Sequence, residues 1–281
     1  MLTISNVQGT FRQPNRADYP ELTGLTSGQI YEGKMGPGGL YLATHMARAL
    51  HLEPGKLVLD LGCGRGATSC FLAGQYSATV IALDLWNPAT AIYRRARAAN
   101  VTERVIPLRL DVTQTLPFAE DYFDAIFCMD AIHYFGANSG FFSRLLALLK
   151  PGGRLVIGSP CFSHEFTSSQ LAHMPCEYDD GTSLWPNEFS RYHSPSWWGD
   201  LISGTGLVTV TTCQELPDGI VLWEDDTLDN MARGQSEQAA LKDAAQILYG
   251  RNHPDFPYLT HFLLAAQKDP SQGERPSGNG P

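Results

Sequence analysis

Apolar and polar positions alternate in blocks through the first half of the chain. Five short runs are almost continuously apolar and predict strands, at residues 57–61, 79–84, 105–110, 123–129 and 154–158. Strands buried on both faces of a parallel sheet have this composition. Segments with apolar residues at helical spacing lie between several of these runs, at 67–74, 89–99 and 140–149. The repeated strand–helix order predicts an α/β fold built on an open, doubly wound sheet.

The flanking segments complete this prediction. A helix is expected at 39–52, two further strands at 207–213 and 258–267, and one helix at 224–249. The stretch from about 161 to 200 is rich in His, Ser, Pro and aromatic residues, and we interpret it as a lid insertion. We therefore expect a single domain over 1–268, with its core at 52–160, followed by a disordered tail at 269–281.

Charge and cysteine content narrow the class of protein. The 281 residues include 20 Lys and Arg against 29 Asp and Glu, a formal net charge of −9. An acidic surface disfavours nucleic acid and anionic lipid as partners, so we expect neither nucleic acid nor membrane binding. The six cysteines form no Cys-x-x-Cys pair, and the sequence shows neither a signal peptide nor an apolar run long enough to span a bilayer. A cytoplasmic location is expected.

The most informative segment is VLDLGCGRG at 58–66, where a buried strand runs into a glycine-rich turn. Ligands of open α/β sheets bind at the carboxyl ends of strands, and glycines let a ligand approach the backbone closely. The dinucleotide pattern G-x-G-x-x-G/A is matched only loosely. Asp60 in the approach to the turn would repel a pyrophosphate and attract an ammonium or sulfonium group. Asp84 ends the next strand and is placed to accept ribose hydroxyls, which nicotinamide and adenosyl cofactors share.

Four segments in order carry a resemblance to a known family. VLDLGCGRG resembles motif I of the class I S-adenosylmethionine-dependent methyltransferases, and VIALDLW resembles the acidic motif that follows it. LRLDVTQTLPFAEDYFDAIFCMDAIHYF resembles the third and fourth motifs, and LLKPGGRLVIGSP the fifth. The resemblance covers 52–160. It implies a Rossmann-like, mostly parallel seven-stranded sheet with helices on both faces, and S-adenosylmethionine as the cofactor, with S-adenosylhomocysteine as its product.

The resemblance also implies roles for individual residues. The glycine turn would pass under the methionine part of the cofactor, with Asp60 near its ammonium group. Asp84 would hold the ribose, while Leu85 and Val112 would contact the adenine, whose amino group would donate to Asp111. The backbone at Asp130 would lie near the methionine end. The residues of the turn itself are Gly62, Cys63, Gly64 and Gly66.

The candidate catalytic residue is His133, just past the fourth strand, because histidine titrates near neutrality as a general base requires. The alternative is a histidine packed against its aromatic neighbours. Tyr134 is a candidate acceptor-binding residue, or else part of the pocket wall. Tyr192 and Trp197 are candidate acceptor-binding residues, or else parts of the core under the lid. Residues 31–39 are glycine-rich and either fold over the cofactor or form a plain connector. The histidines and cysteines of the insertion fit no closed zinc pattern, so no metal is expected.

We therefore predict a methyltransferase (EC 2.1.1.-) that transfers a methyl group to O, N or C of a small, partly apolar metabolite. Two alternatives stay open: a nicotinamide-dependent oxidoreductase using the same glycine turn, and a non-catalytic S-adenosylmethionine-binding protein. The acceptor itself cannot be named, because one fold serves many chemistries. The state of assembly is also left open, a homodimer included.

Overall fold

A computed structural model describes residues 4–173 and 187–273 of the chain. Its centre is a seven-stranded sheet with the strand order β3-β2-β1-β4-β5-β7-β6. Strands β1 to β5 pair in parallel, and β7 is antiparallel to both β5 and β6. The strands are β1 (Leu57–Leu61), β2 (Thr79–Asp84), β3 (Val105–Arg109), β4 (Phe123–Met129), β5 (Leu149–Phe162), β6 (Val208–Glu215) and β7 (Leu259–Lys268). The predicted Rossmann-like, mostly parallel seven-stranded sheet is confirmed.

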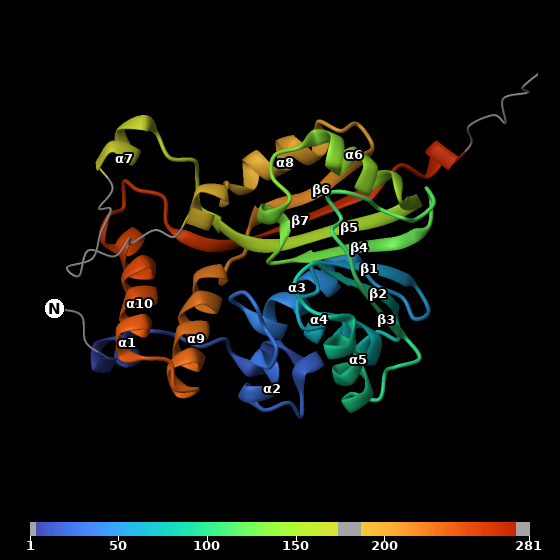
Figure 1. Ribbon diagram of the computed structural model, residues 1–281. Coiled ribbons are helices and arrows are strands. Elements are labelled where there is room, and N and C mark those ends of the chain that lie inside the picture. The colour runs from blue at the N-terminus through green and yellow to red at the C-terminus, as the bar shows by residue number, and fades with distance from the viewer. Residues whose placement is uncertain (1–3, 174–186, 274–281) are drawn as a thin grey trace, which may run out of the picture.

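Helices cover both faces of this sheet, as predicted (Figure 1). On one face lie α3 (Gly39–Leu50), α4 (Ala67–Gln75) and α5 (Ala89–Ala98); on the other lie α6 (Ser139–Ala147) and α8 (Pro195–Ser203). Successive residues of a strand point to opposite faces. Val58 of β1 accordingly joins the core under α3 and α4, and Leu59 joins the core under α6 and α8. The central strands are thus buried on both sides, which explains their continuously apolar sequences.

Helices α1, α7, α9 and α10 lie at one end of the sheet (Figure 1). There α1 packs against α10, and α2 and α10 both contact α9. These helices are α1 (Ile4–Thr10), α2 (Ser27–Tyr31), α9 (Gly219–Ala232) and α10 (Glu237–Asn252). The insertion after β5 holds α7 (Ser168–His173) and the 3-10 turn η4 (Asn187–Arg191). Further 3-10 turns are η1 (Arg16–Asp18), η2 (Pro20–Leu22), η3 (Ile132–Tyr134) and η5 (Pro270–Gly273).

Two predicted boundaries were wrong. The single helix expected at 224–249 is two helices, α9 and α10, because Gly234 adopts a left-handed conformation (φ +90°) and Ser236 caps the second helix by accepting the Ala239 N–H. Strand β5 begins at Leu149 and continues through the Lys-Pro-Gly-Gly segment, whereas the sequence predicted a strand only at 154–158. Its pairing with β4 shifts register between Phe123 and Ala125, which accommodates the extra length.

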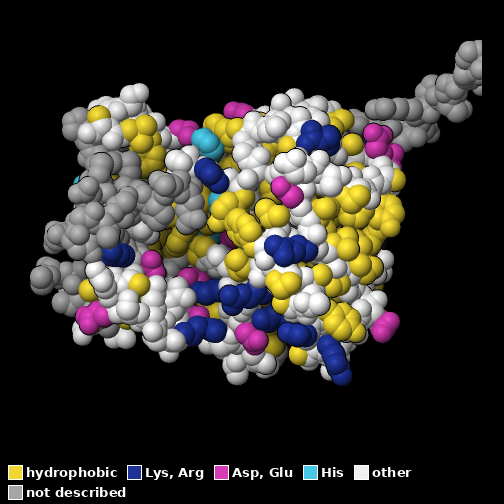
Figure 2. Space-filling view, viewed as in Figure 1, with side chains coloured by type: hydrophobic (Ala, Val, Ile, Leu, Met, Phe, Trp, Pro, Cys, Tyr) yellow, Lys and Arg dark blue, Asp and Glu magenta, His cyan; other side chains and the backbone are white. Residues whose placement is uncertain are grey.

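The surface charge is unevenly distributed. Figure 2 shows Lys and Arg side chains gathered on the lower half of one face, over α2, α4 and α5, although the net charge is −9. Within the part of the chain that the structure describes, no helix is both long and apolar enough to cross a membrane. Over the same residues, no group of three or more His, Cys, Asp or Glu side chains is arranged for a metal ion. Cys176, one of the insertion's potential metal ligands, lies outside the described residues.

Candidate cofactor and acceptor site

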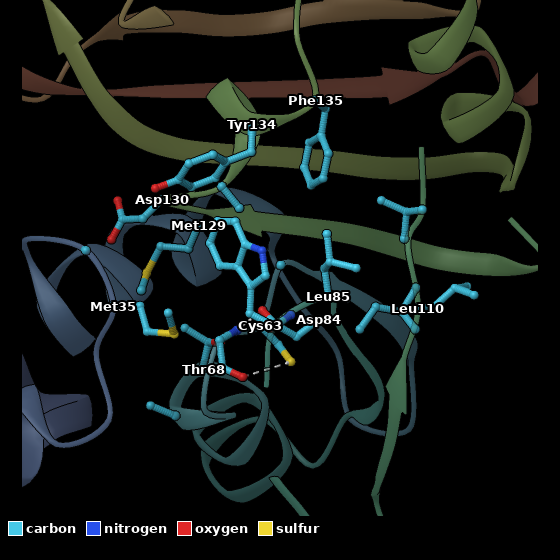
Figure 3. Close-up of a pocket in the computed structure, with 18 of the residues that line it drawn as sticks. Met35, Cys63, Thr68, Asp84, Leu85, Leu110, Met129, Asp130, Tyr134 and Phe135 are labelled. Atoms are coloured by element: carbon cyan, nitrogen blue, oxygen red, sulfur yellow. Dashed lines mark hydrogen bonds between the residues drawn. The ribbon is translucent and has the colours of Figure 1, made fainter. Parts of the chain in front are cut away.

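A cavity of about 250 Å³ opens at the carboxyl ends of β1, β2 and β4 (Figure 3). Its walls come from the glycine turn after β1, the end of β2, the segment after β3, and the turn η3 after β4. Residues 33–36, which precede α3, form a further wall. Four of these walls belong to the predicted motifs, and they meet because parallel strands end at one edge of the sheet.

The glycine turn is shaped by positions that no other residue suits. Gly62, Gly64 and Gly66 all have left-handed backbones, with φ of +74°, +56° and +80°. A Cβ at Gly62 would overlap the side chain of Ala131, and a Cβ at Gly64 would lie 3.2 Å from Met35. The turn therefore has no room for a side chain at Gly62 and little at Gly64, and these glycines line the cavity.

Asp84 holds the turn in place and also lines the cavity. Its Oδ2 atom accepts the Gly64 N–H at 2.9 Å. Its Oδ1 atom accepts the backbone N–H groups of Trp86 and Asn87 at 2.8 and 2.7 Å, and the Asn87 side-chain amide at 2.9 Å. The carboxylate thus ties the end of β2 to the glycine turn. That it also accepts ribose hydroxyls stays a prediction.

Asp60 lies behind the glycine turn and is not among the residues that line the cavity. Its Oδ2 atom accepts the hydroxyls of Thr68 and Ser69, both at 2.6 Å, in the first turn of α4. Burial raises the pKa of Asp60 to about 6. Asp60 thus fastens α4 to β1 through Oδ2, while its Oδ1 atom is buried and has no hydrogen-bond partner among the described residues. The predicted contact with a ligand ammonium group stays a prediction.

Asp130 presents an unsatisfied acid to the cavity. It follows β4 with a left-handed backbone (φ +52°), which is uncommon for a residue with a side chain. Both carboxyl oxygens are buried and have no hydrogen-bond partner among the described residues. Burial raises the pKa of Asp130 well above its ordinary value, Asp226 raises it further, and Lys34 lowers it. The resemblance implied that the backbone at Asp130 lies near the methionine part of the cofactor. In the structure, the carboxyl group of Asp130 is the candidate ligand contact.

The opposite end of the cavity combines apolar side chains with one carboxylate. Leu85 and Val112 line it, as does Asp111, which accepts the backbone N–H and hydroxyl of Thr113 at 3.0 and 2.6 Å. Trp86 was not predicted, yet it lines the cavity with 56% of its surface exposed. Its ring lies edge-on to Tyr134, with ring centroids 5.0 Å apart. The sequence offered one signal for this role of Trp86, since an aromatic residue follows Asp84 and Leu85 at the end of β2.

Residues 59–157 match the family model described as a methyltransferase domain. This segment of the chain, which contains the glycine turn and Asp84, is therefore similar to a methyltransferase domain. Among curated relatives, a phosphoethanolamine N-methyltransferase 1 of Triticum aestivum is 32% identical over 144 residues, which cover 50% of this chain and 28% of that protein. The erythromycin 3''-O-methyltransferase of Saccharopolyspora erythraea is 32% identical over 119 residues, or 42% of this chain and 39% of that protein. The matched region thus spans well under half of either relative.

Solved structures share the fold of this chain. The Haemonchus contortus phosphoethanolamine N-methyltransferase 2 in complex with S-adenosyl-L-methionine superposes with a TM-score of 0.64 at 18% identity, over 86% of this chain and 56% of that one. The [4+2]-cyclase SpnF superposes with a TM-score of 0.60 at 16% identity, over 85% of this chain and 84% of that one. At such identities the likeness concerns the fold.

The remaining predicted site residues differ in whether they reach the cavity. Tyr134 lines the cavity and is 37% exposed. His133 is only 3% exposed, is absent from the lining, and has its Nδ1 atom 3.4 Å from the Ser159 hydroxyl. Burial, with Arg191 nearby, lowers the pKa of His133 to about 4. His133 is therefore neutral at pH 7 but stands outside the cavity wall, so its role as a base stays a prediction.

Two predicted acceptor contacts do not line the cavity. Tyr192 is buried beside Phe189, with stacked rings 4.9 Å apart. Trp197 stacks on His193, with ring centroids 3.6 Å apart, and packs against the core beneath α8. These rings belong to the core under the insertion, the alternative that the sequence left open. Arg191 of the insertion does line the cavity.

Proposed function

We propose that this protein is an S-adenosylmethionine-dependent methyltransferase acting on a small, partly apolar molecule. The observation that carries the proposal is the cavity itself. The family's glycine turn and strand-ending acid form one wall, and the buried, unpartnered carboxylate of Asp130 forms another. A buried carboxylate without a partner is costly unless a ligand supplies a positive group.

The residues of this cavity suit the proposed cofactor. Gly62 and Gly64 leave backbone room where side chains would intrude, which suits the methionine part. Asp130 suits its ammonium group, and Asp84 suits the ribose hydroxyls. Leu85 and Val112 suit an adenine ring, whose amino group would donate to Asp111. When bound, this cofactor supplies an electrophilic methyl group on a sulfonium.

The chain's own contribution to the reaction is alignment and exclusion of water. Alignment of reacting groups can supply about 7–11 kcal/mol of the barrier reduction. Trp86 and Tyr134 offer apolar surface at the cavity for an acceptor, and Arg191 adds a positive charge there. We keep His133 as the candidate base, neutral and able to accept a proton at pH 7. Its Nε2 atom is buried without a partner among the described residues.

The relatives support a small acceptor but not one acceptor atom. Their names include an N-methyltransferase and an O-methyltransferase, and a structural neighbour from Streptomyces coelicolor is a geranyl diphosphate C-methyltransferase. We also keep the single domain over 1–268 and the cytoplasmic location as proposals. The homodimer remains open.

Ligand binding tests the cofactor assignment first. S-adenosylhomocysteine should raise the melting temperature of the protein and NADH should not, because only a ligand of the native state stabilises it. The reverse result would favour the oxidoreductase alternative. Methyl transfer needs its own measurement, since the same fold is found in a protein named as a cyclase. We would screen a metabolite library for release of S-adenosylhomocysteine, with Gly64→Val as the inactive control. Binding without turnover on any acceptor would favour a non-catalytic protein.

A further inference from the structure

Residues 33–36, here called the strap, cross the cavity between its two principal walls. Met35 lies against the glycine turn, so close that a Cβ on Gly64 would be 3.2 Å from its side chain. Gly36 lies against the other wall, where an added Cβ would be 2.5 Å from the Asp130 carboxylate. Figure 3 shows Met35 between Asp130 on one side and Thr68 on the other. The strap therefore spans both groups that the proposed cofactor would contact.

The strap is held from outside the cavity, by helix α9. The Lys34 ammonium group pairs with the Asp226 carboxylate and lies 3.8 Å from Oδ2 of Asp229. Just before the strap, the Tyr31 hydroxyl donates to the Asp225 carboxylate. The three side chains of the Lys34 cluster are only 10–13% exposed. Helix α9 contributes no residue to the cavity wall, yet it fixes the segment that closes it.

Buried ion pairs contribute little net stability, because desolvation offsets the attraction between the charges. Their best-attested role is to select one arrangement of the chain. Burial raises the pKa of Asp226 to about 6, while Lys34 lowers it, and the Asn230 side-chain amide also donates to this carboxylate at 3.1 Å. On the cavity side, the strap has a further polar tie, from the Asn87 side-chain amide to the Met35 sulfur at 3.1 Å. The Lys34 pair is thus the principal polar anchor of the strap.

We propose that Lys34 is a positioning residue: its ion pair with Asp226 and Asp229 holds the strap closed, and thereby sets how long the cofactor stays bound. This inference rests on the proposed function for the identity of the ligand. Opening the strap removes one contact from the glycine turn and uncovers Asp130. Loss of the anchor should therefore raise the dissociation rate of the ligand more than it changes the association rate.

Two measurements on the full chain test this proposal with Lys34→Met. Hydrogen exchange of the strap amides in the free protein should rise about tenfold or more, because local opening no longer breaks the ion pair. The dissociation rate of S-adenosylhomocysteine should rise about tenfold, with the association rate changed less than about threefold. Lys34→Arg, which keeps the charge, should restore most of both values. Asp226→Asn, which removes the partner instead, should behave like Lys34→Met.

Arg12→Met is the matched control. It breaks the Arg12–Glu224 pair, which also ties the N-terminal segment to α9 but lies away from the cavity wall. It should leave the strap exchange and the ligand dissociation rate unchanged. Equal effects of Arg12→Met and Lys34→Met would overturn the proposal, as would native exchange and dissociation in Lys34→Met. If the unmodified protein bound no S-adenosylhomocysteine, the proposed function would fail, and hydrogen exchange would still decide the anchor.

Discussion

Replacing Asp84 by Asn tests the link between the glycine turn and the proposed ribose site. The substitution keeps the size of the side chain and removes its charge. The Asn carbonyl oxygen can serve the three donors that Oδ1 now serves, from Trp86 and Asn87. Its NH₂ group then faces the Gly64 N–H, which is a donor and loses its acceptor. One buried backbone group in the turn is left unsatisfied.

The size of the effect follows from these hydrogen bonds. An unsatisfied buried donor costs about 1–3 kcal/mol. In a protein of this size each kcal/mol lowers the melting temperature by about 2–4 °C, so a fall of about 2–12 °C is expected. A hydrogen bond to a charged acceptor contributes about 1.5–3 kcal/mol. Loss of one such bond to the ribose should weaken S-adenosylhomocysteine binding about 10- to 150-fold.

Calorimetric titration with S-adenosylhomocysteine and thermal unfolding measure the two effects separately. Asp269→Asn is the control, since it removes the same charge at an exposed position where the carboxylate accepts only from Ser271. A lower melting temperature with unchanged affinity would limit Asp84 to holding the turn. Unchanged values of both quantities would refute the reasoning altogether.

Three further predictions concern packing, pH and the acceptor. Gly62→Ala should lower the free energy of unfolding, measured by urea titration, by about 2–5 kcal/mol, because the position combines a left-handed backbone with a steric overlap. The control Gly55→Ala, at a left-handed position with open space around it, should lower the same free energy by only about 1–2 kcal/mol. If His133 is the base, kcat/KM should fall as the pH drops through about 4 and stay level above that pH, because a protonated imidazole cannot accept a proton. An acidic limb near pH 6.5 that disappears in His133→Gln would contradict the lowering of the His133 pKa by burial. Trp86→Ala should raise KM for the acceptor with little change in melting temperature, because the side chain lines the cavity and is exposed. The control Tyr93→Ala, at a similarly exposed position outside the cavity wall, should leave KM unchanged.

The local pattern of the chain was sufficient to predict the core of the domain. Apolar runs reveal buried parallel strands, because each strand meets helices on both faces. The glycine turn was predictable for a similar reason, since left-handed backbone and close approach of a ligand are properties of a short segment. The order of the motifs then placed Asp84, Leu85, Asp111 and Val112 at one sheet edge, where the structure finds them lining the cavity.

The tertiary structure alone decided what faces the cavity and what lies behind it. Asp60 lies near the end of β1 and Asp130 directly after β4, yet only Asp130 lines the cavity, whereas Asp60 accepts hydrogen bonds from the first turn of α4. Which way each side chain points depends on packing between elements, and the sequence does not record it. The anchor of the strap is the extreme case: Lys34 and Asp226 are separated by 192 positions. No local pattern signals such a pair, because only the folding of α9 against the N-terminal segment brings the two charges together.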